Sequence, residues 1–116
     1  MLSSFKNAFV GLFMAIKSER NMKVHLVMAF LVTFLGLYFE ISRMEWLVQT
    51  LTISAVMGAE IFNTSIEKLC DILHPEKHIG IGQTKDLAAG AVLIISIAAV
   101  IIGLVIYLPR MYVLLN

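Results

Sequence analysis

The feature that most constrains this chain is a run of 22 residues without a charged side chain, Leu87–Leu108. A helix needs about 20 residues to cross the ~30 Å hydrocarbon core of a bilayer, so this run can span it unaided. Two shorter uncharged runs precede it, Val24–Phe39 and Trp46–Ala59. The first suffices if the stem of Lys23 reaches toward the interface. The second is too short, so we expect its helix to continue past Glu60.

The composition agrees with an integral membrane protein. Of the 116 residues, 59% are hydrophobic and 15% are charged, whereas a soluble domain has roughly 45–50% apolar and about 25% charged residues. A chain this small has too little interior to hide so much apolar surface. The net charge of +1 argues against a nucleic-acid partner. Cys70 is the only cysteine, which argues against a disulfide and a Cys/His zinc site.

The N-terminal segment has the pattern of an amphipathic helix rather than of a cleavable signal. Basic residues interrupt it throughout, and it contains no apolar h-region or small-residue cleavage site. Its apolar residues recur at spacings of three and four, which predicts a helix that lies in the membrane surface. These residues are Phe5, Ala8, Phe9, Leu12, Phe13 and Ile16.

Lysine and arginine predict the orientation in the membrane. Seven of the nine basic residues lie in the N-terminal segment and in residues 68–86, and such residues favour the cytoplasmic side. We therefore expect a multi-pass protein of the cell membrane with its N-terminus in the cytoplasm and its C-terminus outside. The expected order within the single domain 1–116 is a surface helix (1–22), a first span (23–40), a second span that extends into the cytoplasm (46–72), a cytoplasmic loop (73–86) and a third span (87–108).

A polar face on the second span indicates a functional site. If Trp46 marks the outer boundary, the helical rise places Glu60 about 21 Å deep and Glu67 about 31 Å deep, at the inner edge. An ionisable group inside a span costs several kcal/mol and usually marks a pathway or a site, so Glu60 is a candidate proton acceptor. Asn63 and Thr64 alone would also fit a role in binding helices together. The face comprises Glu60, Asn63, Thr64, Glu67 and Asp71.

Glu19 is expected at the same depth as Glu67, at the cytoplasmic end of the surface helix. Two carboxylates with phosphate oxygens and water can hold Mg²⁺, although Glu19 by itself is typical of a solvated surface charge. In the expected loop, Gly80 and Gly82 would let the backbone approach a phosphate, but the spacing is not that of a P-loop. His25 is typical of a residue that caps the start of a span. A small multidrug-type transporter and a non-catalytic membrane adaptor are the alternatives to an enzyme.

Three segments resemble a known family. The sequence AEIFNTSIEKLCD, residues 59–71, resembles the signature of the prokaryotic diacylglycerol kinase family. Lys85-Asp86, followed by AAGAVLI, is similar to the start of that family's third span. FKNAFVGLFMAIKSERNMKVH, residues 5–25, resembles the Gram-positive branch, whose members are chiefly undecaprenol kinases. The similarity covers nearly the whole chain.

The resemblance implies an all-α homotrimer with active sites shared between neighbouring subunits at the cytoplasmic interface. It implies ATP-dependent phosphorylation of a membrane lipid alcohol, undecaprenol first and diacylglycerol as the alternative. By the same resemblance, Glu60 is the catalytic base, Glu19 and Glu67 bind Mg²⁺, and Asn63 and Asp71 organise the site. The chain departs from the family at Gln83-Thr84, where Arg and Ala are usual, and at Asn7 and Lys77, where Tyr is common. The implied ATP-contact positions are Asn7, Glu19, Glu67, Glu76, Lys77, His78, Lys85 and Asp86.

Overall fold

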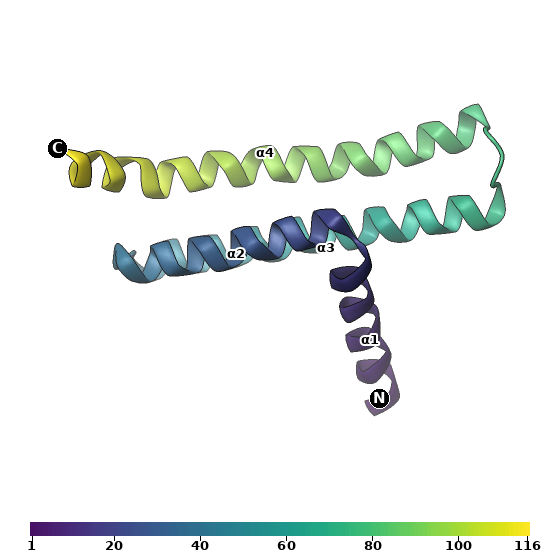
Figure 1. Cartoon of the computed structure of the whole chain (residues 1–116), viewed down its shortest axis with the longest axis horizontal. Coiled ribbons are helices and arrows are strands. Elements are labelled where there is room, and N and C mark those ends of the chain that lie inside the picture. Colours follow the sequence, from purple (N-terminus) through teal and green to yellow (C-terminus); the bar gives the residue numbers. More distant parts are fainter.

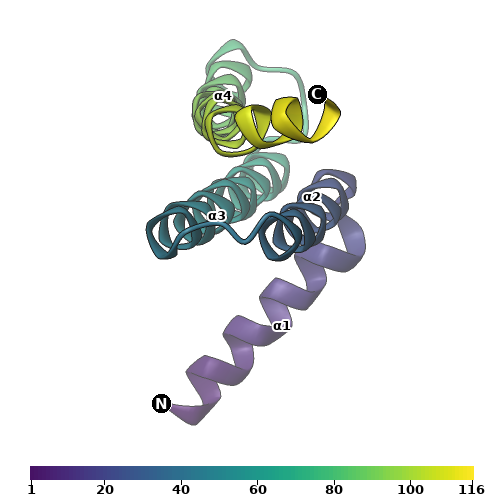
Figure 2. The same cartoon turned by 90° about the vertical axis from the view of Figure 1, so that its left-hand side faces the viewer.

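The computed structural model describes all residues, Met1–Asn116, as four α-helices with short connections. Helices α2, α3 and α4 lie side by side as an antiparallel bundle, and α1 leaves this bundle at a steep angle (Figures 1 and 2). Seen along the bundle in Figure 2, the three long helices form a triangle. The helices are α1 (Leu2–Ser18), α2 (Arg20–Tyr38), α3 (Arg43–Leu73) and α4 (Ile79–Leu115).

The exposed surface is that of a membrane protein. Two helices are long and apolar enough to cross a bilayer: Arg20–Phe39, with a mean hydropathy of 1.8, and Ile79–Leu115, with 3.0. Only 12 of the 116 residues are buried, and the chain exposes large apolar side chains along all four helices. On α1, Phe5, Phe9 and Phe13 are each more than half exposed. Apolar surface on this scale requires a membrane or protein partners to cover it.

The connection between α2 and α3 is a tight, well-capped turn. Glu40 adopts a positive φ of 51°. Ser42 then caps α3, because its hydroxyl accepts a hydrogen bond from the Glu45 amide and the Glu45 carboxylate accepts one from the Ser42 amide. Gly36 lets the two helices approach closely, since a Cβ there would lie 2.7 Å from the Trp46 ring. The turn therefore fixes the register of α3 against α2.

A buried polar cluster joins the three long helices at the same end of the bundle. The Val32 carbonyl on α2 accepts hydrogen bonds from the Gln49 side chain at 3.2 Å and from the Tyr107 hydroxyl at 2.9 Å. The Gln49 side-chain oxygen is a second acceptor within hydrogen-bond reach of the same Tyr107 hydroxyl, whose single proton the two acceptors share. Gln49 and Tyr107 are buried, so these bonds form away from water, where an unpaired polar group would be costly. The hydrogen bonds of this cluster therefore hold α2, α3 and α4 together.

One expected helix boundary is wrong. The surface helix was expected to reach residue 22, but α1 ends at Ser18, because Glu19 takes an extended conformation (φ −101°, ψ 121°) and α2 begins at Arg20. The helix that contains the expected third span, 87–108, is longer than that span and continues to Leu115 with Pro109 inside it. Proline at this position removes the backbone donor for the Val105 carbonyl, and the next carbonyl, that of Ile106, accepts a hydrogen bond of 2.6 Å from the Arg110 side chain.

The irregular loop expected over residues 73–86 is wrong for most of that segment. The connection is only the segment 74–78, and α4 begins at Ile79. The physical reason is a cap: the His78 ring accepts hydrogen bonds from the amides of Gly80 and Ile81, two of the donors that a helix start leaves unpaired. Gly80 and Gly82 therefore belong to the first turns of a helix rather than to a phosphate-binding loop.

An ion pair between α3 and α4 predicts a pH dependence of stability. Arg110 donates two hydrogen bonds to the Glu45 carboxylate, at 2.7 and 2.8 Å. The Arg110 guanidinium, together with the Ser42 amide, lowers the Glu45 pKa from 4.5 to about 2. Because the folded-state pKa is depressed, the stabilisation is present above pH 4.5 and is lost as the pH falls toward 2.

We expect Glu45→Gln to lower the melting temperature in detergent at pH 7, and the difference from wild type to shrink between pH 4.5 and 2. Glu40→Gln is the matched control, because Glu40 lies in the same turn and forms no ion pair. Thermal unfolding followed by circular dichroism measures both variants. A difference that stays constant down to pH 2 would contradict the assigned pair.

Candidate active site

One face of α3 places charged and polar side chains in the interior of the bundle. Glu60 is only 3% exposed, and its neighbours Asn63 and Thr64 are also buried. These three residues share a face because they lie three and four positions apart on a helix. A buried carboxylate is costly unless it is paired or hydrogen-bonded, so its partners identify the site.

The partners of Glu60 come from α2. The Asn21 side-chain amide donates a hydrogen bond to Glu60 Oε1 at 3.4 Å, and His25 Nε2 lies 3.8 Å from Glu60 Oε2. Each carboxylate oxygen thus faces one α2 side chain. Sequence reasoning missed Asn21 entirely and gave His25 only a capping role. The two residues are four positions apart and so share a face of α2, but this spacing does not indicate which helix that face contacts.

The next turn of α3 holds a second carboxylate and two unpaired oxygens. The Asn63 amide donates to Glu67 Oε1 at 3.1 Å, which leaves the other Glu67 oxygen available. Asn63 Oδ1 and Thr64 Oγ1 are buried without a hydrogen-bond partner. Such atoms in a native protein usually face an ordered water, an ion or a ligand. This part of the α3 face therefore has oxygen atoms that can bind a water molecule, an ion or a ligand.

A pocket of about 270 Å³ adjoins this turn, between α1 and α3, and half of the ten residues that line it are hydrophobic. Thr64, Ser65 and Lys68 line it from α3, and Ser18 lines it from the end of α1. Glu19, which forms the break between α1 and α2, is half-buried. The sequence analysis expects Glu19 and Glu67 at the same depth, and this stays a prediction. No group of three or more His, Cys, Asp or Glu side chains could hold a metal ion.

Two of the predicted site residues pair with each other at the far end of α3. Lys85 on α4 forms an ion pair and a hydrogen bond with Asp71, and both side chains are accessible to solvent. This contact joins the end of α3 to the second turn of α4. It places a cation one turn beyond Glu67, on the side of the bundle where α3 and α4 connect (Figure 1).

The other predicted nucleotide contacts lie apart from Glu60 within one chain. Asn7 is exposed on α1, which points away from the bundle, and Asp86 is exposed near the start of α4. Glu76 and Lys77 lie in the connection between α3 and α4, and the His78 ring caps α4. No side-chain hydrogen bond or ion pair links any of these residues to Glu60 or Glu67.

Comparison with known proteins identifies the family. The model of the family described as prokaryotic diacylglycerol kinase matches residues 6–107. The chain belongs to this family. It is 35% identical to the undecaprenol kinase of Bacillus subtilis over 108 residues, which cover 93% of this chain and 88% of that protein. It is 33% identical to a diacylglycerol kinase of Synechocystis over 110 residues, which cover 94% of this chain and 63% of that protein.

The family expected from the sequence is therefore confirmed, and the chain is a lipid kinase. The transporter and adaptor alternatives are set aside. For an enzyme of this class, the buried Glu60 and its α2 partners, Asn21 and His25, are the candidate residues for contact with the lipid that accepts the phosphate.

The contact between Asn21 and Glu60 predicts a loss of turnover without a loss of nucleotide binding. A hydrogen bond to a charged group contributes about 1.5–3 kcal/mol, and the bond here is long. We therefore expect Asn21→Ala to lower kcat roughly 10-fold, with an unchanged KM for ATP. Asn116→Ala at the C-terminus is the matched control. Steady-state kinetics measures kcat, and thermal unfolding measures stability. An unchanged kcat would contradict the role of Asn21, and so would a lower kcat that is explained by a loss of folded protein.

Proposed function

We propose that this lipid kinase transfers the γ-phosphoryl group of ATP to undecaprenol and forms undecaprenyl phosphate. The observation that carries the site assignment is the buried Glu60 carboxylate, held between α2 and α3 at the point where the α3 face changes from apolar to polar. The choice of lipid is supported by the Bacillus relative, whose length this chain matches closely. Diacylglycerol is the alternative acceptor, since the Synechocystis relative bears that name.

In the proposed reaction Glu60 accepts the proton of the lipid hydroxyl. The oxygen then attacks the γ-phosphorus of ATP, the bond to the β-phosphate oxygen breaks, and ADP leaves. Asn21 and His25 hold the Glu60 carboxylate toward the hydroxyl. Such catalysis depends chiefly on positioning and on electrostatic stabilisation of the transferring group.

The residues around Glu67 fit a magnesium ion that accompanies ATP. Mg²⁺ prefers oxygen ligands and usually binds through one or two carboxylates together with phosphate oxygens, and Glu67 has one oxygen without a partner beside the unpaired Asn63 Oδ1. We assign Glu19 and Glu67 as its protein ligands. The bound ion offsets negative charge on the phosphates, a task that Lys85 shares.

We further propose that three copies of the chain assemble around shared sites. One observation supports this: the apolar surface of the single chain is extensively exposed. A neighbouring copy would bring its own residues to complete the nucleotide site, with α1 lying in the membrane surface. The expected contacts are Asn7, Glu19, Glu67, Glu76, Lys77, His78, Lys85 and Asp86.

The first experiment measures transfer of labelled phosphate from ATP to undecaprenol and to diacylglycerol in mixed micelles. We expect the higher kcat/KM with undecaprenol. Removing a positioned general base typically costs 10²–10⁴-fold, so Glu60→Gln should lose nearly all transfer while it still binds Mg-ATP. Glu40→Gln is the control for the substitution itself. A higher kcat/KM for diacylglycerol would refute the choice of lipid, and Glu60→Gln with more than about a third of wild-type kcat would refute the base.

Subunit mixing tests the shared sites. Glu19→Gln and Glu60→Gln should each be inactive, and Glu19→Gln should also require more Mg²⁺ for any residual turnover. If the two residues of one site come from different subunits, mixed assemblies regain activity, because some sites then receive both native residues. Mixed assemblies confirmed by differential tagging but without recovered activity would show that each site lies within one chain.

The proposed orientation places the N-terminus and residues 74–86 in the cytoplasm, and residues 40–42 and the C-terminus outside. On a Cys70→Ser background, cysteines introduced at Ser42 and Asn116 should react with an impermeant maleimide added to cells without an outer barrier. A cysteine at Gln83 should react only after permeabilisation. Labelling of Gln83 from outside would place Lys85 and Asp71 away from cytoplasmic ATP and would refute this orientation.

A further inference from the structure

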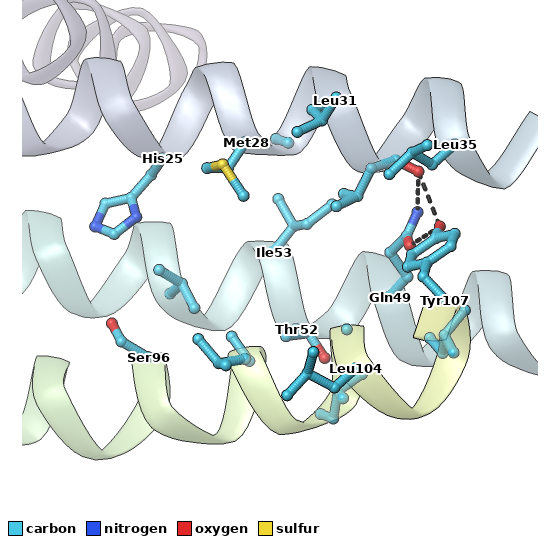
Figure 3. A pocket seen from close by; sticks show the side chains of 18 of the residues that line it. His25, Met28, Leu31, Leu35, Gln49, Thr52, Ile53, Ser96, Leu104 and Tyr107 are labelled. Atoms are coloured by element: carbon cyan, nitrogen blue, oxygen red, sulfur yellow. Dashed lines mark hydrogen bonds between the residues drawn. The ribbon is translucent and has the colours of Figure 1, made fainter. Parts of the chain in front are cut away.

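An apolar cavity lies between the three long helices. It has a volume of about 490 Å³, and 15 of the 20 residues that line it are hydrophobic. Figure 3 shows Met28, Leu31 and Leu35 of α2 facing Ile53 of α3 and Leu104 of α4 across it. No Asp, Glu, Lys or Arg lines the cavity. The lining suits a hydrocarbon and does not suit ATP.

The two ends of the cavity differ. His25 and Ser96 lie at one end, and Gln49 and Tyr107 lie at the other (Figure 3). At the second end, Gln49 and Tyr107 bond to each other and to the Val32 carbonyl, so this buried cluster closes the cavity with polar groups whose bonding is satisfied. Ser96 and Tyr107 are eleven residues apart on α4, which makes the cavity about 16 Å long.

The end of the cavity near His25 adjoins the Glu60 carboxylate. On α3 the cavity is lined by Gln49, Val56 and Met57, and Glu60 is the next residue of the same face, because it follows Val56 by four positions and Met57 by three. His25 lines the cavity and also lies 3.8 Å from Glu60 Oε2. The apolar half of the α3 face therefore leads directly to its carboxylate half.

We propose that this cavity binds the hydroxyl-bearing end of a single polyisoprenoid chain, with the hydroxyl at Glu60 and the first isoprene units extending toward Gln49 and Tyr107. This inference rests on the proposed function and specifies how the lipid is selected. With C–C bonds of about 1.52 Å and angles of about 111°, an extended chain advances roughly 1.25 Å per bond, or about 5 Å per isoprene unit. The length of about 16 Å thus takes about three units.

The size of the cavity explains a preference for one chain over two. A volume of 490 Å³ lies in the lower half of the ~300–1,000 Å³ range of pockets that enclose one drug-sized molecule. Diacylglycerol carries two long acyl chains close to its hydroxyl, and the second chain would have to remain outside. The remaining units of a long polyprenol leave the cavity between α2 and α4, which contact each other less than either contacts α3.

Chain length provides the first test. Wild-type enzyme is assayed with 3-methylbut-2-enol, geraniol, farnesol and undecaprenol, which contain one, two, three and eleven isoprene units. Each additional buried methylene in an apolar pocket changes kcat/KM by roughly 10–200-fold, although a flexible chain gains less. We expect kcat/KM to rise at least about 10-fold per unit up to farnesol and to change less than that from farnesol to undecaprenol. A profile that is flat from one to three units would overturn the proposal.

Three leucine substitutions on α4 test where the lipid chain lies in the cavity. Ala99 and Gly103 both line the cavity. Measured along the axis of α4, they lie about 4.5 Å and about 10.5 Å from Ser96. A Cβ at Gly103 meets nothing within 4 Å, so a side chain there enters open space. Ala98 is exposed and lies outside the cavity, which makes Ala98→Leu the matched control for Ala99→Leu.

We expect Ala99→Leu to raise the KM of geraniol, farnesol and undecaprenol at least about 10-fold. Gly103→Leu should do so for farnesol and undecaprenol but spare geraniol, which is too short to reach it. Ala98→Leu should match wild type, and all variants should keep the wild-type KM for ATP and the wild-type assembly size. Equal effects of Ala99→Leu and Ala98→Leu would overturn the proposal. So would loss of assembly in Ala99→Leu with an unchanged chain-length profile, because a helix of a second copy would then fill the cavity.

The outcomes separate this inference from the proposed function. If wild-type enzyme phosphorylates undecaprenol and the chain-length profile is flat, the proposed function stands and the cavity assignment fails. If wild-type enzyme phosphorylates diacylglycerol and no polyprenol, both fail.

Discussion

The structure depends on one costly group, the Glu60 carboxylate, which is 3% exposed in a bundle whose surface is apolar. An isolated charge in such surroundings would be strongly disfavoured, and it is tolerated where hydrogen-bonding partners replace water. Here those partners are Asn21 and His25, which both belong to α2. The start of α2 must therefore lie against α3 for the site to exist, and the break at Glu19 permits this, because it frees α2 from the direction of α1.

A single helical face of α3 accounts for most of the remaining architecture. The part of this face from Gln49 to Met57 lines the apolar cavity, and the part from Glu60 to Glu67 carries two carboxylates. One straight helix thus connects a hydrocarbon environment to an aqueous one, as a lipid kinase requires of its acceptor and donor. The same polar face explains why α2 and α4, and not α3, have the composition of simple membrane-crossing helices. α3 depends on its neighbours to cover a face that lipid would not solvate.

The sequence predicted those parts of the site that depend on local periodicity. The spacing of Glu60, Asn63 and Glu67 is sufficient to place them on one face, and the structure shows Asn63 bonded to Glu67. The partners of Glu60 could not be derived in this way, because a pairing across 39 positions of sequence depends on how two helices pack. The expected loop at 73–86 failed for a different reason: two glycines indicated an irregular backbone, whereas the His78 ring supplies the cap that starts α4 at Ile79.

The distribution of stabilising contacts is asymmetric along the bundle, and this asymmetry suits the chemistry. At the end near Gln49, a buried polar cluster and the Arg110–Glu45 pair connect all three long helices. At the opposite end, α4 is joined to α3 by the solvent-accessible Lys85–Asp71 pair, and exposed ion pairs contribute little to stability. Local opening follows the lowest local stability, so the end near Lys85 is expected to separate more easily, and this is the end where the nucleotide is proposed to bind. The contacts near Gln49 hold the three long helices in register, and the position of Asn21 and His25 beside Glu60 depends on that register.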